Sequence, residues 1–175
     1  MTKLVGYRDM LRRMSKLFQF PNPVNETSAR IVAGGVVAIS TIFLITDSTL
    51  VLIALTYGFA ARVAAGPTFS PLAIFATRIV TPRLSLNHKF VPGPPKRFAQ
   101  TIGFTFAATA LALTLLDYSL AAKLVIAALI FAATLESVFA VCLGCIVFNF
   151  LMKIELIPQS VCESCNDISR VTARV

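Results

Sequence analysis

Residues 31–46 read IVAGGVVAISTIFLIT, and after Asp47 and Ser48 the chain continues at residues 49–66 as TLVLIALTYGFAARVAAG. Each stretch approaches the roughly 18–20 apolar residues that a helix needs to cross about 30 Å of hydrocarbon. Two such stretches joined by a two-residue polar connection predict a transmembrane helical hairpin, interrupted only by Arg62 near its end.

A second pair of apolar runs lies further along the chain. Thr101–Leu116 reads TIGFTFAATALALTLL, and a longer run starts near Ser119 and stays apolar to Met152, broken by Lys123 and Glu136. At 1.5 Å per residue, a straight helix of that length would reach roughly 50 Å. The fourth run is therefore expected to tilt, kink or leave the bilayer.

These runs predict an all-α integral membrane bundle of about four transmembrane helices in two hairpins. We place the membrane domain at residues 27–153, with hairpins 30–66 and 100–152 and a cytoplasmic loop 67–99 that is Pro-rich, basic and extended in its second part. The composition agrees, since 57% of the residues are hydrophobic, 14% are charged and the mean hydropathy is +0.80. These values argue against a soluble enzyme.

The positive charge predicts the orientation. The net charge is +8, and every Lys and Arg except Arg62 and Lys123 lies in the N-terminal arm, the middle loop or the C-terminal segment. The positive-inside rule then places these three regions, and both termini, in the cytoplasm. The basic residues flank membrane spans without an aromatic platform, so the expected partner is the lipid bilayer and not a nucleic acid.

Residues 1–20 carry apolar residues at helical spacing on one face and basic residues on the other. This pattern predicts an amphipathic helix on the cytoplasmic face of the membrane, or one that packs on a partner protein. Asn25 to Ser28 offers caps for the first span.

The two hairpins also show a weak internal similarity. Arg30, a pair of glycines and Asp47 mark the first, and Arg97, Gly103 and Asp117 mark the second. Because both hairpins start on the same side, a duplication would relate them by an axis normal to the membrane.

Four cysteines form two pairs of identical spacing, Cys142 with Cys145 and Cys162 with Cys165. The second pair lies in the predicted cytoplasmic tail, residues 154–175. In one interpretation the pairs carry out thiol–disulfide redox or sulfur chemistry, because a C-x-x-C dithiol brings two sulfurs within reach of each other. If the first pair is helical, both its sulfurs share one helix face.

Two other interpretations stay open. All four cysteines could hold one zinc or iron ion, since the two C-x-x-C pairs are 16 residues apart, which falls in the range of four-cysteine metal sites. Alternatively, Cys142 and Cys145 are small packing residues beside Gly144. Apart from such a zinc or iron ion, the sequence does not identify a cofactor.

Glu136 and Arg62 are ionisable residues within the apolar runs, each toward the inner end of its span. Charged groups at such depth are costly and usually paired, so we expect a Glu136–Arg62 ion pair or snorkelling of both. In the redox interpretation Glu136 would relay a proton near Cys142 and Cys145. Lys123 is expected only to snorkel at the outer interface.

The motifs PPKRFAQ at residues 94–100 and CLGC at residues 142–145 resemble a bacterial membrane family known as domain of unknown function 4395. The resemblance covers roughly residues 27–153 and implies four helices in the bacterial inner membrane. Some members occur with thioredoxin-like or sulfurtransferase proteins, which implies such a partner here. Val141 stands where the family usually has an aromatic residue, Glu136 where it has an amide, and the tail cysteines lie outside the shared region.

Two classes of function therefore remain. The first is a cytoplasm-facing thiol redox or sulfur-handling protein in which Cys142 and Cys145 are the primary dithiol. The second is a non-catalytic accessory subunit that docks on a larger membrane complex. The substrate, the physiological partner and the oligomeric state do not follow from the sequence.

Overall fold

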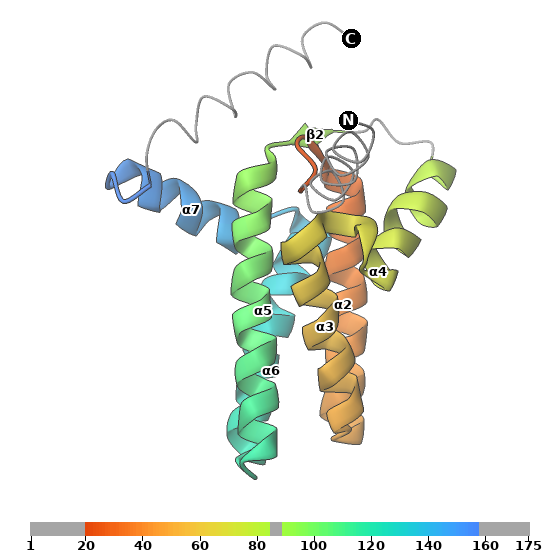
Figure 1. Ribbon diagram of the computed structural model, residues 1–175, viewed down its shortest axis with the longest axis vertical. Helices are drawn as coiled ribbons and strands as arrows, with labels where there is room; N and C mark the ends of the chain where they lie inside the picture. Colours follow the sequence, from red (N-terminus) through yellow and green to blue (C-terminus); the bar gives the residue numbers. More distant parts are fainter. Residues whose placement is uncertain (1–19, 85–88, 158–175) are drawn as a thin grey trace, which may run out of the picture.

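The computed structural model describes residues 20–84 and 89–157, and within them it is an all-α membrane bundle with one small pair of strands. Four helical segments in this part of the chain are long and apolar enough to cross a membrane. In Figure 1 they run side by side along the long axis. We call the end with the Asp47 and Asp117 turns the turn end, and the end where the first helix of each hairpin begins the polar end.

The first hairpin consists of α2, Glu26–Thr46, and α3, Thr49–Ala65. Asn25 caps α2 as predicted, because its Oδ1 accepts hydrogen bonds from the backbone N–H groups of Thr27 (2.9 Å) and Ser28 (3.4 Å). At the other end Asp47 adopts the left-handed conformation, with φ 51°, and closes the helix. Asp is one of the few residues with a side chain that tolerates this conformation.

The second hairpin consists of α5, Gly93–Leu115, and α6, Ser119–Phe139. The expectation that residues 89–97 are extended is wrong beyond Pro92, since α5 begins eight residues before the predicted start at Thr101. Pro94 and Pro95 fit the first turn of the helix, where no intrahelical partner exists for an N–H group. This extension brings Lys96 and Gln100 into the bundle.

The two halves of the described chain repeat one order of elements. Strand β1, Val24–Asn25, precedes α2, and strand β2, Phe90–Val91, precedes α5; the strands pair antiparallel. The cross-hairpin contacts also match, because α2 packs on α6 and α3 packs on α5. Arg30 donates to the carbonyl of Ser137 (3.0 Å) near the end of α6, and Arg97 donates to the carbonyl of Val63 (3.0 Å) near the end of α3.

Each hairpin is followed by a shorter helix that packs back on the first span of its own half. After α3, α4 (Pro71–Ile74) and the π-helix Phe75–Val80 lie against α2, and after α6, α7 (Leu143–Lys153) lies against α5. Figure 1 shows α4 and α7 on opposite sides of the bundle near its polar end. These contacts and the repeated element order fit a parallel duplication.

The long fourth apolar run is broken at Ala140. Residue 140 takes the left-handed conformation, with φ 58°, and α7 starts three residues later in a new direction (Figure 1). The run therefore leaves the axis of α6 instead of tilting as one helix. Its second part, α7, has 11 residues, fewer than a helix needs to span the bilayer.

Small residues allow the four spans to pack closely. The core combines fully buried alanines with larger side chains: Val36, Phe43, Leu52, Leu55, Phe59, Ala107, Ala110, Ala122, Ile126, Leu129 and Ala133. A Cβ at position 103 would collide with the ring of Phe59, so Gly103 lets α5 approach α3. Lys123 does more than snorkel, because its Nζ lies 2.7 Å from Oδ2 of Asp47 and joins the two hairpins at the turn end.

The left-handed break at Ala140 yields a stability prediction. A Cβ in this conformation costs about 1–2 kcal/mol, so Ala140→Gly should stabilise the protein by up to about 1 kcal/mol after the entropy cost of glycine. Ala127→Gly, at an exposed position inside α6, should instead destabilise it by about 1 kcal/mol. Equilibrium unfolding in detergent measures both, and equal losses in the two variants would contradict the role of the break.

Candidate thiol site

The candidate site lies at the start of α7, beside the ends of α5 and α6. Cys142 is the N-cap residue of α7 in an extended conformation, and Cys145 lies in the first turn. The shared helix face expected for a helical pair does not apply here, because only Cys145 lies within a helix and Cys142 precedes its first residue. The backbone N–H groups of Cys145 (3.0 Å) and Ile146 (3.1 Å) donate to the Cys142 carbonyl, which places both thiols at the positive end of the helix.

Close packing holds α7 against α5. A Cβ added to Gly144 would stand 2.5 Å from Cβ and 2.6 Å from Cα of Ala99, so only glycine fits this contact. One turn further along, the rings of Phe148 and Phe98 pack with centroids 5.6 Å apart. The expected packing role of Gly144 thus has a definite partner, and this contact fixes the position of Cys142.

The two thiols differ in their environment. Cys142 is 8% exposed, and Cys145 is partly exposed. A hydrogen bond from the Cys145 thiol lowers the pKa of Cys142, and the positive charge of Lys96 also lowers it. Burial and the negative charge of Glu136 raise this pKa, but the two lowering effects outweigh them. Donating that bond, together with burial, raises the pKa of Cys145. Of the two thiols, Cys142 therefore has the lower pKa.

Lys96 and Glu136 form a buried ion pair next to the thiols. Lys96 Nζ lies 2.6 Å from Oε1 of Glu136, and the two side chains are 9% and 15% exposed. The predicted pairing of Glu136 with Arg62 is wrong, because α5 starts early enough to insert Lys96 between the hairpins. Glu136 thus lies near Cys142, as the redox interpretation expects, with a different cation.

Arg62 is held by neutral partners. Its Nε donates to Oε1 of Gln100 (2.7 Å), its Nη1 donates to Oγ of Ser70 (3.2 Å), and its guanidinium lies 4.4 Å from the centre of the Phe59 ring. Within the described residues its Nη2 is buried without a hydrogen-bond partner. Arg62 does not snorkel to the surface, since it is only 4% exposed.

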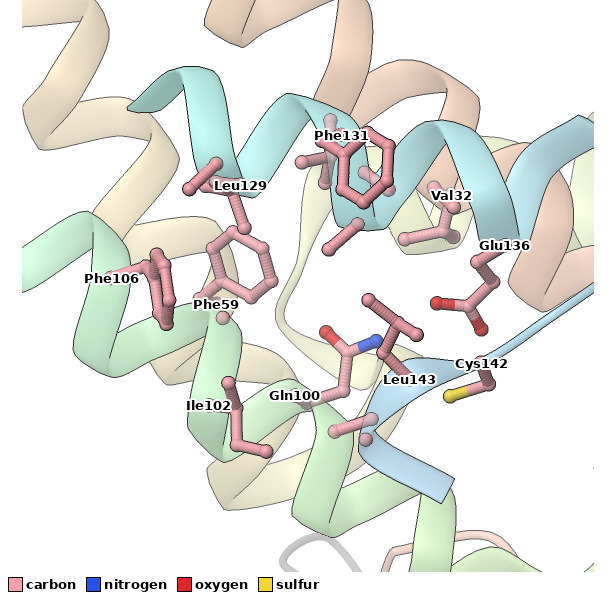
Figure 2. Close-up of a pocket in the computed structure, with 18 of the residues that line it drawn as sticks. Val32, Phe59, Gln100, Ile102, Phe106, Leu129, Phe131, Glu136, Cys142 and Leu143 are labelled. Atoms are coloured by element: carbon pink, nitrogen blue, oxygen red, sulfur yellow. The ribbon is translucent and has the colours of Figure 1, made fainter. Parts of the chain in front are cut away.

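A cavity of about 360 Å³ adjoins the Cys142 thiol. Its walls come from α2, α3, α5, α6 and the start of α7, and Gln100, Glu136 and Cys142 are the lining residues with polar side chains. Figure 2 shows these three side chains on one side of the cavity and the rings of Phe59 and Phe106 on the other. The site is thus an apolar chamber with the Cys142 thiol, the Gln100 amide and the Glu136 carboxylate at one side.

Sequence reasoning missed Lys96 and Gln100 as site residues, although both belong to the PPKRFAQ motif. They stand four residues apart, so on a helix they share a face. Their four-residue spacing would have indicated a shared face if the motif had been interpreted as helical. Its two prolines instead favoured an extended chain.

The other predicted ligands cannot be placed. Cys162, Cys165 and the amphipathic helix predicted for residues 1–20 lie outside the described residues, apart from Phe20. Within residues 20–84 and 89–157, no three His, Cys, Asp or Glu side chains come together as a possible metal site. The four-cysteine zinc or iron site therefore stays a prediction.

The fold and composition define a multi-pass helical integral membrane protein. Residues 24–153 match the model of the family described as "Domain of unknown function (DUF4395)", and the chain belongs to this family. The match includes the whole membrane bundle and α7. Comparisons with curated proteins and with solved structures gave no match.

The hydrogen bond between the thiols gives a pH prediction. Because the Cys145 thiol stabilises the Cys142 thiolate, Cys145→Ala should raise the pKa of Cys142, while Cys145→Ser keeps a donor and should raise it less. At neutral pH the alanine variant then holds less thiolate. The pH dependence of alkylation by iodoacetamide, followed on the Cys142 peptide by mass spectrometry, measures this. Identical profiles for the two variants would contradict the assignment.

Proposed function

We propose that this protein carries out thiol–disulfide redox or sulfur-transfer chemistry at the membrane, with Cys142 as the nucleophilic thiol and Cys145 as the resolving thiol. The observation that supports it most is the position of Cys142: buried at the start of α7, accepting a hydrogen bond from Cys145 and adjoining the Lys96–Glu136 pair. A purely structural cysteine needs neither a stabilised thiolate nor a second thiol within reach.

The chemistry balances as an exchange with a dithiol or disulfide partner. The Cys142 thiolate attacks one sulfur of a partner disulfide, forming a mixed disulfide and releasing the other partner sulfur as a thiolate. The Cys145 thiol then loses its proton and attacks Cys142, closing the intramolecular disulfide and releasing the fully reduced partner. Glu136 is the proposed acceptor of the Cys145 proton, because its carboxylate lies beside the thiol pair, where it contacts Lys96 at 2.6 Å.

The proposed partner is a thioredoxin-like or sulfurtransferase protein in the cytoplasm. The orientation comes from the positive-inside rule, which favours a cytoplasmic polar end. Cys162 and Cys165 are proposed to pass electrons between this partner and the buried dithiol.

Thiol trapping tests the proposal. In a full-length Cys162→Ser/Cys165→Ser background, diamide should convert the two remaining thiols into one disulfide, seen as protection from maleimide and as a loss of two mass units. Cys145→Ser should instead accumulate a mixed disulfide with oxidised glutathione at Cys142, and Cys142→Ser should react far less. The unfolding transition of each variant shows whether the fold is kept.

The accessory-subunit interpretation predicts a different result. If both thiols stay reduced with every oxidant while the protein remains folded, the redox proposal fails. In that case the Gly144–Ala99 contact, and the small residues around it, would explain the CLGC motif as packing.

A further inference from the structure

The cavity beside Cys142 opens toward the membrane. Its lining includes Phe131 on α6 and Leu143 and Val147 on α7, which are 64%, 37% and 43% exposed. Phe131 belongs to a membrane-spanning helix, so this exposed apolar rim faces hydrocarbon. A ligand that enters between α6 and α7 therefore comes from the bilayer.

The inner wall of the cavity carries a fixed hydrogen-bond donor. The Oε1 atom of Gln100 accepts from Arg62 at 2.7 Å, and this bond sets the orientation of the amide. Figure 2 shows the amide nitrogen directed toward the side where Glu136 and Cys142 lie. No described residue accepts a hydrogen bond from this NH₂ group. The group can therefore donate to a ligand oxygen beside the Cys142 thiol.

We infer that this cavity binds a membrane-soluble quinone, which accepts electrons from the Cys142–Cys145 dithiol. A quinone has a flat ring that suits the space between Phe59, Phe106 and Phe131, carbonyl oxygens for the Gln100 amide, and an apolar tail that extends past the rim into lipid. The inference rests on the proposed redox function and names its electron acceptor: the partner dithiol reduces the Cys142–Cys145 disulfide by the reverse of the exchange described above, and the quinone oxidises the pair again.

The reaction balances in atoms and electrons. Both S–H bonds break and one S–S bond forms between Cys142 and Cys145, so the dithiol loses two electrons and two protons. The two electrons and two protons reduce the quinone to the hydroquinone, whose two oxygens become hydroxyl groups. Glu136 lines the cavity and touches the same space as the Cys142 thiol, so it is placed to pass a proton to the ring oxygen.

A lipid acyl chain fits the chamber less well. It would fill the apolar part but would leave the Gln100 amide and the thiol facing hydrocarbon without a polar partner. A water-soluble substrate would have to cross the apolar rim. The quinone is the ligand class that uses the rim, the amide and the thiol together.

The test uses the full-length Cys162→Ser/Cys165→Ser protein in nanodiscs, with Cys142 and Cys145 reduced and decylubiquinone as the probe. Quinone reduction is followed by its ultraviolet absorbance and thiol loss by maleimide trapping, with diamide as a quinone-independent oxidant. Ala132→Leu adds bulk to the cavity wall, and Ala127→Leu adds the same bulk at an exposed position of α6 outside the lining. Cys145→Ser removes the possibility of an internal disulfide.

We expect one hydroquinone per disulfide, a rate lower by about tenfold or more in Ala132→Leu, and no change in Ala127→Leu. Diamide should oxidise the parent protein and the two leucine variants at equal rates. The Cys145→Ser variant should form no hydroquinone with the quinone. Equal quinone rates in the two leucine variants would overturn the cavity as the binding site. Oxidation by diamide without oxidation by the quinone would overturn the inference and leave the redox function standing. Resistance to both oxidants would overturn the redox function itself.

Discussion

Replacing Lys96 by methionine is expected to destabilise the protein by about 3–5 kcal/mol, because the substitution leaves the buried Glu136 carboxyl without its partner. The two side chains are 9% and 15% exposed, so water cannot replace the lost contact. The double variant Lys96→Met/Glu136→Leu removes both charges and should recover most of the loss. Equilibrium unfolding in mixed micelles of the single and double variants measures the effect and the coupling between the sites.

The protein contains a matched control at the other end of the bundle. Lys123 and Asp47 also join the two hairpins at 2.7 Å, but their side chains are 35% and 55% exposed. Lys123→Met should therefore cost less than about 1 kcal/mol. A loss in Lys96→Met no larger than in Lys123→Met would show that the inner pair is not a stabilising link between the hairpins.

Gly144→Val should release α7 from α5 and expose the Cys142 thiol. The new side chain meets the Cα and Cβ atoms of Ala99, and neither backbone nor Cβ can move aside cheaply. Overpacking of this kind costs about 1–3 kcal/mol, which makes the detached state roughly 5- to 150-fold more populated. The alkylation rate of Cys142, measured at fixed pH in a Cys145→Ser background, should rise accordingly.

Asn149→Val places the same side chain at an exposed position of the same helix and serves as the control. Its Cys142 alkylation rate should match that of the parent. If Gly144→Val reacts no faster than Asn149→Val, the glycine does not hold the site closed. The cavity rim at Leu143 and Val147 would then be set by other contacts.

The start of α5 explains why the sequence analysis missed two residues of the site, Lys96 and Gln100. Local signals at Pro94 and Pro95 argue for an extended chain, yet prolines are accepted in the first helical turn. Once the helix begins at Gly93, Lys96 and Gln100 enter the bundle and take up Glu136 and Arg62 as separate partners. If the third span starts at Thr101, Lys96 lies in the loop, and Glu136 and Arg62 are the two opposite charges at this end of the membrane domain. The sequence therefore predicts that they pair with each other.

The break at Ala140 has a similar cause. The apolar pattern continues through residues 140–142, and no glycine or proline marks a helix end there. The length of the run showed that a single straight helix was unsuitable. The point where the chain leaves the axis of α6 depends on where α7 packs, which is the contact of Gly144 with Ala99 on α5, more than 40 residues earlier in the sequence.

The sequence by itself determined the four spans, the turns at Asp47 and Asp117 and the Asn25 cap. These features are local, because in hydrocarbon each segment must satisfy its own backbone hydrogen bonds and apolar length alone identifies it. The tertiary structure decided the Lys96–Glu136 pairing, the place of Cys142 at a helix start and the chamber beside it. Those features depend on which face each helix turns toward its neighbours. Packing among many small residues sets the rotation of each helix about its axis, and no local sequence pattern reveals that rotation.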